Sequence, residues 1–248
     1  MQKGYNMSAF ISSEFIKELD GFYARNDLDG AGDFLARSLD LCRRGGNRAG
    51  LLTVLDECVG YYRQTGDEEA GMKAVNECLD LIDEMRLDAK TSGTILLNCA
   101  TTMKAFGKAG EAMKYYAEVE KKLTSALPGN DPLIAGLCNN MALALQDNGD
   151  IEKAEKCFIK ALEITEENDS TALEYAVTCV NLAHLRFDRD YLDKSVNELL
   201  DSAYNILSDD RFTSYPRYGF TCRKCAPSYG FFGRIADEKE INERGEKY

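Results

Sequence analysis

Apolar and polar positions repeat along this chain with a period of 41 or 42 residues. Each period holds two stretches in which apolar residues share one face of an α-helix. The turns between the two stretches fall at Gly66, Gly107, Gly149 and Asp190. A period of this length is typical of stacked helical hairpins, because one hairpin cannot bury its own apolar face and must pack against its neighbours. We therefore expect an all-α protein.

Residues 135–164 show the pattern most completely. We expect two helices of about three turns each, packed antiparallel around a turn at Gly149. Glycine adopts the left-handed conformation that commonly ends a helix, and Asp150 can then cap the next helix. The small residues Ala142 and Ala154 allow the two helices to approach closely. This segment is the clearest single hairpin in the sequence.

These residues resemble the tetratricopeptide repeat (TPR), which has a small residue at position eight, a Gly-Asp turn at fifteen and sixteen, and alanines at twenty and twenty-seven. The loop at 127–132, followed by the run Asn139–Leu143, is similar to the longer repeat of the kinesin light chain type. The resemblance covers about residues 52–207. It implies a right-handed α-solenoid of about five hairpins with a C-terminal capping helical segment, forming a single domain over 1–248. We place the hairpins at 12–44, 52–86, 93–127, 135–168 and 176–207, and the cap at 218–248.

Charge and composition restrict the partners. The chain carries a formal charge of −12, and its 30 basic residues are dispersed, so we expect neither nucleic-acid nor membrane binding. No stretch is apolar enough to span a membrane, and no secretory leader is evident. Nine cysteines, an odd number, lie mostly at core positions of the repeats, which favours free thiols in a reducing compartment. We expect a cytoplasmic protein.

Motifs for catalysis, cofactors and metals are nearly lacking, so we expect a protein that is not an enzyme. His184 is the only histidine, and no phosphate-binding loop occurs. The segment Asp27–Gly30 resembles a calcium loop, but its glycine position does not fit, and we interpret it as a corner between helices. The pair Cys222 and Cys225 lacks a second ligand pair, which favours packing over zinc binding and leaves a redox-sensor role as the alternative.

The candidate site lies on the first helix of each hairpin, which lines the concave surface in TPR arrays. Position six of successive units carries Asn98, Asn140 and Asn181. A primary amide can pair with both the C=O and the N–H of an extended peptide, and such contacts tolerate many sequences. A structural alternative is that these asparagines bond to the backbone of the adjacent repeat. Neighbouring groove positions add Asn139, Arg63, Lys104, Thr101 and His184.

We therefore predict a protein–protein interaction scaffold that binds an extended peptide or a partner helix in the concave groove. A ligand-responsive TPR sensor of a signalling peptide is the alternative function. The aromatic segment Tyr215–Phe232 either completes the cap or leaves an apolar patch through which the protein forms a homo-oligomer.

Overall fold

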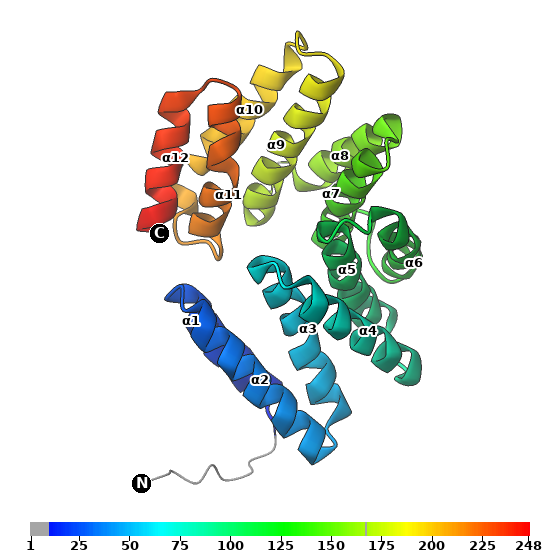
Figure 1. The fold of residues 1–248 in the computed structure, drawn as a ribbon. Coiled ribbons are helices and arrows are strands. Elements are labelled where there is room, and N and C mark those ends of the chain that lie inside the picture. Colours follow the sequence, from blue (N-terminus) through cyan, green and yellow to red (C-terminus); the bar gives the residue numbers. More distant parts are fainter. Residues whose placement is uncertain (1–9, 167) are drawn as a thin grey trace. The chain divides into compact units, whose positions relative to one another are not determined.

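The structure is a computed structural model that describes residues 10–166 and 168–248. Twelve α-helices and two short 3-10 helices form in these residues, and no strand does (Figure 1). The expected all-α repeat fold is confirmed. The chain divides into two compact units, Met1–Lys122 and Leu123–Tyr248, so the single continuous domain stays a prediction. Residues 1–9, on which the expectation of no leader depends, lie outside the described part of the chain.

The first unit is a stack of helical hairpins. Its helices are α1 (Ser12–Ala24), α2 (Leu28–Gly45), α3 (Arg48–Thr65), α4 (Glu68–Glu84), α5 (Ala89–Ala105) and most of α6 (Ala109–Ala126). Successive helices from α1 to α5 pack against each other, and α3 also contacts α5. The first helices of two neighbouring hairpins therefore touch. Buried apolar side chains close the core between α3, α4 and α5, among them Leu55, Val59, Val75, Cys78 and Cys99.

The second unit contains three complete hairpins. Their helices are α7 (Pro132–Asp147), α8 (Ile151–Thr165), α9 (Ala172–Arg189), α10 (Ser195–Leu207), α11 (Tyr218–Phe231) and α12 (Ile235–Lys247), with the 3-10 helices η1 (Asp169–Thr171) and η2 (Asp210–Phe212). The pairs α7–α8, α9–α10 and α11–α12 each pack closely, and α9 contacts both α7 and α11. The C-terminal segment is thus a hairpin that follows the repeats, as a cap requires.

The turns follow the local chemistry expected from the sequence. Gly66, Gly107 and Gly149 have φ angles of +76°, +77° and +81°, which glycine adopts without a Cβ penalty. The Asp150 carboxylate accepts a hydrogen bond from the Lys153 N–H at 3.4 Å, as a helix cap does. Asp190 differs, since its φ is −148° and its carboxylate instead accepts from the Leu192 N–H at 3.0 Å.

The core residues predicted for residues 135–164 are buried. Ala142 and Ala154 have no exposed surface, so α7 and α8 approach closely over them, and Phe158 fills the space beside them. Cys222 and Cys225 lie in the core of the second unit. Burial raises the pKa of the Cys225 thiol to about 12, which keeps it protonated at pH 7 and supports the packing interpretation.

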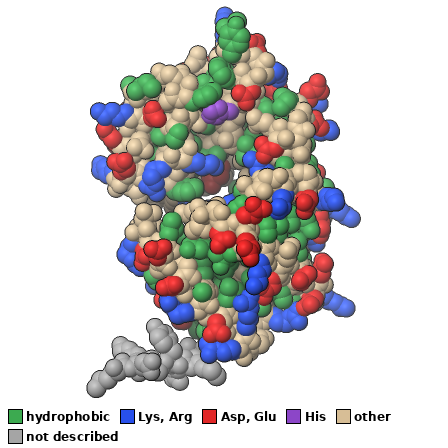
Figure 2. Space-filling view, viewed as in Figure 1, with side chains coloured by type: hydrophobic (Ala, Val, Ile, Leu, Met, Phe, Trp, Pro, Cys, Tyr) green, Lys and Arg blue, Asp and Glu red, His purple; other side chains and the backbone are tan. Residues whose placement is uncertain are grey.

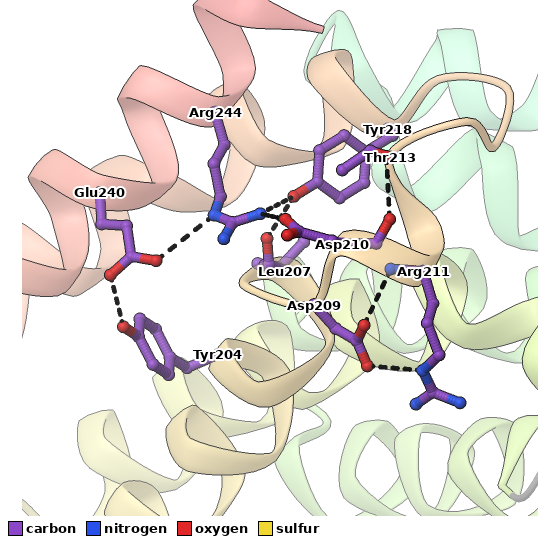
Figure 3. A network of polar contacts seen from close by, with 9 residues as sticks. All are labelled: Tyr204, Leu207, Asp209, Asp210, Arg211, Thr213, Tyr218, Glu240 and Arg244. Atoms are coloured by element: carbon purple, nitrogen blue, oxygen red, sulfur yellow. Dashed lines mark hydrogen bonds and ion pairs between the residues drawn. The ribbon is translucent and has the colours of Figure 1, made fainter.

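A polar network fastens the last hairpin to the one before it (Figure 3). Arg244 on α12 donates to Asp210 at 2.9 Å, to the Tyr218 hydroxyl at 3.3 Å and to Glu240 at 3.3 Å. Glu240 also accepts from the Tyr204 hydroxyl of α10 at 2.7 Å. The bonds join α10, η2, α11 and α12, and most of the side chains are partly buried. These hydrogen bonds fix how α11 and α12 are oriented against α10, in addition to the apolar packing of the cap.

Candidate functional site

The eight predicted site residues lie on the first helices of four hairpins, and all eight are partly buried. We call the surface of α3 and α5 the A-helix face of the first unit. The surface of α7, α9 and α11 is the A-helix face of the second unit. Arg63, Asn98, Thr101 and Lys104 belong to the first face. Asn139, Asn140, Asn181 and His184 belong to the second.

On the first face, Asn98 links α5 to α3. Its Nδ2 donates to both the backbone carbonyl and the Oδ1 of Asp56, each at 2.9 Å. Its Oδ1 accepts from Nη1 of Arg63 at 2.8 Å, and the same nitrogen donates to Thr102 Oγ1 at 2.8 Å. The bond to the Asp56 carbonyl is the one that the structural alternative anticipated. These bonds use the donor and acceptor sides of the Asn98 amide within the protein.

Asp56 contacts the candidate site through Asn98, and the repeat pattern did not single it out. Burial raises the pKa of its carboxyl, while the hydrogen bond from Asn98 and the charge of Arg63 oppose that rise. Asp56 stands at position five of its repeat, and Arg63 stands at position twelve. The Asn98 amide and the charge of Arg63 thus offset part of the cost of burying the Asp56 carboxylate.

The second face repeats the same bond with different residues. Nδ2 of Asn181 on α9 donates to Oδ1 of Asn139 on α7 at 3.0 Å. In both pairs, the position-six amide donates to the position-five side chain of the preceding hairpin, 42 residues earlier. Asn139 and Asn181 are therefore brought together. Asn140 lies beside them on α7, and within the described residues it forms no hydrogen bond through its side chain.

The remaining polar positions of the first face are Thr101 and Lys104. The Thr101 hydroxyl donates to the backbone carbonyl of Leu97 at 2.7 Å and accepts from the Tyr116 hydroxyl at 3.4 Å. Lys104 follows one turn later on α5 and is half-buried. Both side chains lie on the same helix as Asn98.

His184 lies in an aromatic cluster that sequence reasoning did not find. Its ring centroid is 5.1 Å from that of Phe231 and 4.8 Å from that of Phe232. Its Nε2 is 3.0 Å from the Ser228 hydroxyl. Burial lowers the pKa of His184, partly offset by Asp188, so the ring is neutral at pH 7. The period of the repeats predicts His184 on the first helix of its hairpin, where the structure has it. Phe231 and Phe232 come from the C-terminal hairpin, where the repeat pattern fades.

On the face of the molecule drawn in Figure 2, charge is mixed rather than segregated. In the view of Figure 2, acidic and basic side chains are interspersed between hydrophobic ones. Among the described residues, no group of three or more histidine, cysteine or acidic side chains has the arrangement of a metal site. In the same part of the chain, no helix combines the length and apolarity needed to span a membrane.

Comparison with known proteins agrees with the architecture. Residues 135–168 match a family model described as a tetratricopeptide repeat. BtubC (BKLC) from P. vanneervenii is 17% identical, with a TM-score of 0.59, and the similarity covers 89% of this chain and 90% of that one. No curated protein sequence matches the chain.

Two other solved structures have a similar fold. A Podosopora anserina protein described by its kinesin light chain TPR-like repeats is 17% identical, with a TM-score of 0.56 over 79% of this chain and 93% of that one. PilF of Pseudomonas aeruginosa is 11% identical, with a TM-score of 0.55 over 93% of this chain and 88% of that one. At these identities the likeness concerns the fold alone. The resemblance to TPR proteins of the kinesin light chain type is thereby confirmed, with one hairpin matched in sequence and the helical-repeat architecture matched over most of the chain.

Proposed function

We propose that the protein is a non-enzymatic interaction module that binds an extended peptide or a partner helix along its A-helix faces. A TPR-like fold supports a general role as a protein-interaction scaffold. The observation that carries the finer proposal is the position of Asn140. Its half-buried amide stands beside the Asn139–Asn181 bond without a hydrogen-bond partner in the described residues. Such an amide offers two donors and one acceptor to a peptide backbone.

The hydrogen bonds between repeats fix the positions of the first helices on each A-helix face before a partner binds. The bonds Asn98–Asp56 and Asn181–Asn139 hold neighbouring first helices in register. A rigid face loses little conformational entropy when a partner binds, which favours affinity. In this proposal Asn140, Lys104, Thr101 and His184 contact the partner directly. Asn98, Asn139, Asn181 and Arg63 border the bound chain and fix the spacing of the helices beneath it.

Peptide selection with the full chain tests the proposal. Peptides are selected from a displayed random library, and their affinities are measured for the wild type, Asn140→Ala and Asn197→Ala. Asn197 is a matched control, because it is an exposed asparagine on the second helix α10. We expect the Asn140→Ala variant to bind about fivefold to tenfold more weakly, since a lost hydrogen bond costs about 1 kcal/mol. Failure to select any peptide, or equal affinities for the two variants, would contradict the proposal.

A ligand-responsive sensor is the second function that the sequence leaves open. It uses the same A-helix faces and differs in its response, because the ligand then favours one conformation over another. Small-angle scattering with a selected peptide separates the two functions. A scaffold keeps its radius of gyration when the peptide binds, whereas a sensor changes it.

A further inference from the structure

We propose that the aromatic cluster of His184, Phe187, Phe231 and Phe232 anchors an aromatic side chain of a basic peptide. This inference rests on the proposed function and adds the chemistry of the partner to it. The cluster lies on the A-helix face of the second unit, where the last turns of α9 and α11 meet. It combines exposed aromatic surface, fixed ring geometry and an excess of acidic groups.

The phenylalanine rings are held in place by each other. Phe187 on α9 is 5.5 Å from Phe231 and 5.3 Å from Phe232, with interplanar angles of 82° and 89°. Phe231 and Phe232 are 5.0 Å apart at 88°. These edge-to-face contacts are favourable arrangements for aromatic pairs. A further aromatic ring can continue the pattern, and the rings already in place lose little freedom when it does.

The exposed surface of the cluster is not needed to close the core of the cap. Tyr218, Tyr229 and Ile241 close the core of the last hairpin, and each has at most 1% of its surface exposed. Phe231 is 59% exposed although it contacts two other phenylalanines and His184. Exposed rings that cluster in this way mark interaction sites, whereas single exposed apolar residues are ordinary.

Phe220, also on α11, is a single exposed phenylalanine outside the cluster. It is 50% exposed, and within the described residues it makes no ring contact with another aromatic side chain. Phe220 therefore offers a control of the same residue type, on the same helix and of similar exposure.

The charges around the cluster favour a basic partner. Asp188 is exposed directly after Phe187. The Glu238 carboxylate packs against the backbone directly before Phe231, since a Cβ built on Gly230 lies 2.3 Å from Glu238 Oε2. Complementary charges of this kind steer and orient a partner.

The cations near the cluster are already engaged. Arg234 binds Asp201 at 2.7 Å and Asp237 at 2.6 Å. Arg186 and Arg189 both bind Glu155. Lys224 lies one turn before Ser228 on α11, farther along the helix from the final turn than Phe231. We therefore expect the basic residues of a partner near Asp188 and Glu238. The acidic excess thus lies at the turn end of the cluster.

Fluorescence anisotropy with defined peptides tests the inference. The probe is a labelled peptide of alternating lysine and serine with one central phenylalanine. Two comparison peptides carry alanine in place of the phenylalanine or glutamate in place of the lysines. The proteins are the wild type, Phe231→Ala, Phe220→Ala, Asp188→Asn and Glu174→Gln. Glu174 is an exposed acidic residue at the start of α9 and serves as the charge control.

We expect the lysine–phenylalanine peptide to bind more tightly than both comparison peptides. The Phe231→Ala variant should bind it about tenfold more weakly, and Phe220→Ala should bind within twofold of the wild type. Asp188→Asn should weaken binding about twofold to fivefold at low salt, and Glu174→Gln should leave it unchanged. Thermal unfolding of each variant confirms that it is folded.

Three results would overturn the inference. The first is equal affinity for the three peptides, or no binding of any of them. The second is an equal effect of Phe231→Ala and Phe220→Ala. The third is a concentration-dependent dimer in sedimentation that Phe231→Ala abolishes, because the cluster would then join two copies of this chain. In each case the proposed function still stands if Asn140→Ala weakens the peptides selected from the library, so the two proposals fail separately.

Discussion

The side-chain amide of Asn181 donates a hydrogen bond to the side-chain oxygen of Asn139 at 3.0 Å, across the boundary between two hairpins. In the first unit, Asn98 makes the corresponding bond to Asp56 at 2.9 Å. The acceptor is a neutral amide in one case and a carboxylate in the other. The chain therefore contains its own comparison between a neutral and a charged group at one position of the repeat.

Replacing Asp56 with asparagine should leave the protein as stable as the wild type at pH 7, within about 1 kcal/mol. The new amide oxygen can still accept from Asn98, as Asn139 accepts from Asn181. Burial raises the pKa of Asp56, so ionisation is less favourable in the folded state than in the unfolded state. The wild type should therefore lose stability as the pH rises from about 4 through that raised pKa. Urea unfolding at pH 4.5 and pH 7 measures both effects, and a loss above about 2 kcal/mol for Asp56→Asn would contradict this account.

The reciprocal change, Asn139→Asp, should destabilise the second unit at pH 7 by about 1 kcal/mol. Position twelve of this hairpin is Gln146, which provides no charge where Arg63 provides one in the first unit. The added carboxylate would thus be partly buried beside the Asn181 amide, without the charge that Arg63 supplies in the first unit. Lowering the pH should protonate it and reduce the difference from the wild type. Chemical unfolding at pH 7 and pH 4.5 gives the comparison, and a larger difference at the lower pH would count against it.

Replacing either of two glycines in the same hairpin with alanine should change the stability of the protein, in opposite directions for the two positions. Gly149 has a φ of +81°, so Gly149→Ala should cost about 1 kcal/mol. Gly136 lies inside α7, and among the described residues an added Cβ would meet no atom within 4 Å beyond its own stretch of helix, so Gly136→Ala should stabilise by about 0.5–1 kcal/mol. Thermal unfolding of the two variants tests the pair. Equal shifts in the unfolding midpoint would show that the turn does not depend on left-handed geometry.

Lowering the pH should destabilise the protein, because protonation of His184 favours the unfolded state. Burial lowers the pKa of this residue in the folded state, and Asp188 offsets part of that effect. Stability from the neutral ring is therefore complete above the unfolded pKa of about 6.5 and declines as the pH falls below it. The His184→Gln variant lacks this titration, so its unfolding midpoint should fall less than that of the wild type between pH 7.5 and pH 5.5. A parallel decline in both proteins would exclude His184 as the cause.

The turns and hairpins could be predicted from the sequence because their causes are local. A glycine that must adopt positive φ and an aspartate that caps a helix act within a few residues, as Gly149 and Asp150 do. The partners of the site residues depend instead on contacts between helices. The bond between Asn98 and Asp56 spans 42 residues, and that between His184 and Ser228 spans 44. The separation of 42 residues follows from the regular period. The separation of 44 residues depends on how the irregular C-terminal hairpin packs against α9.

Photo-crosslinking of a selected peptide tests the central claim most directly. The peptide carries a photoreactive group, and mass spectrometry locates the crosslinked residues on the 248-residue chain. The account predicts crosslinks on the first helices, α3 and α5 in the first unit and α7, α9 and α11 in the second, and their loss in competition with unlabelled peptide. Crosslinks confined to the second helices α4, α8, α10 and α12 would contradict it.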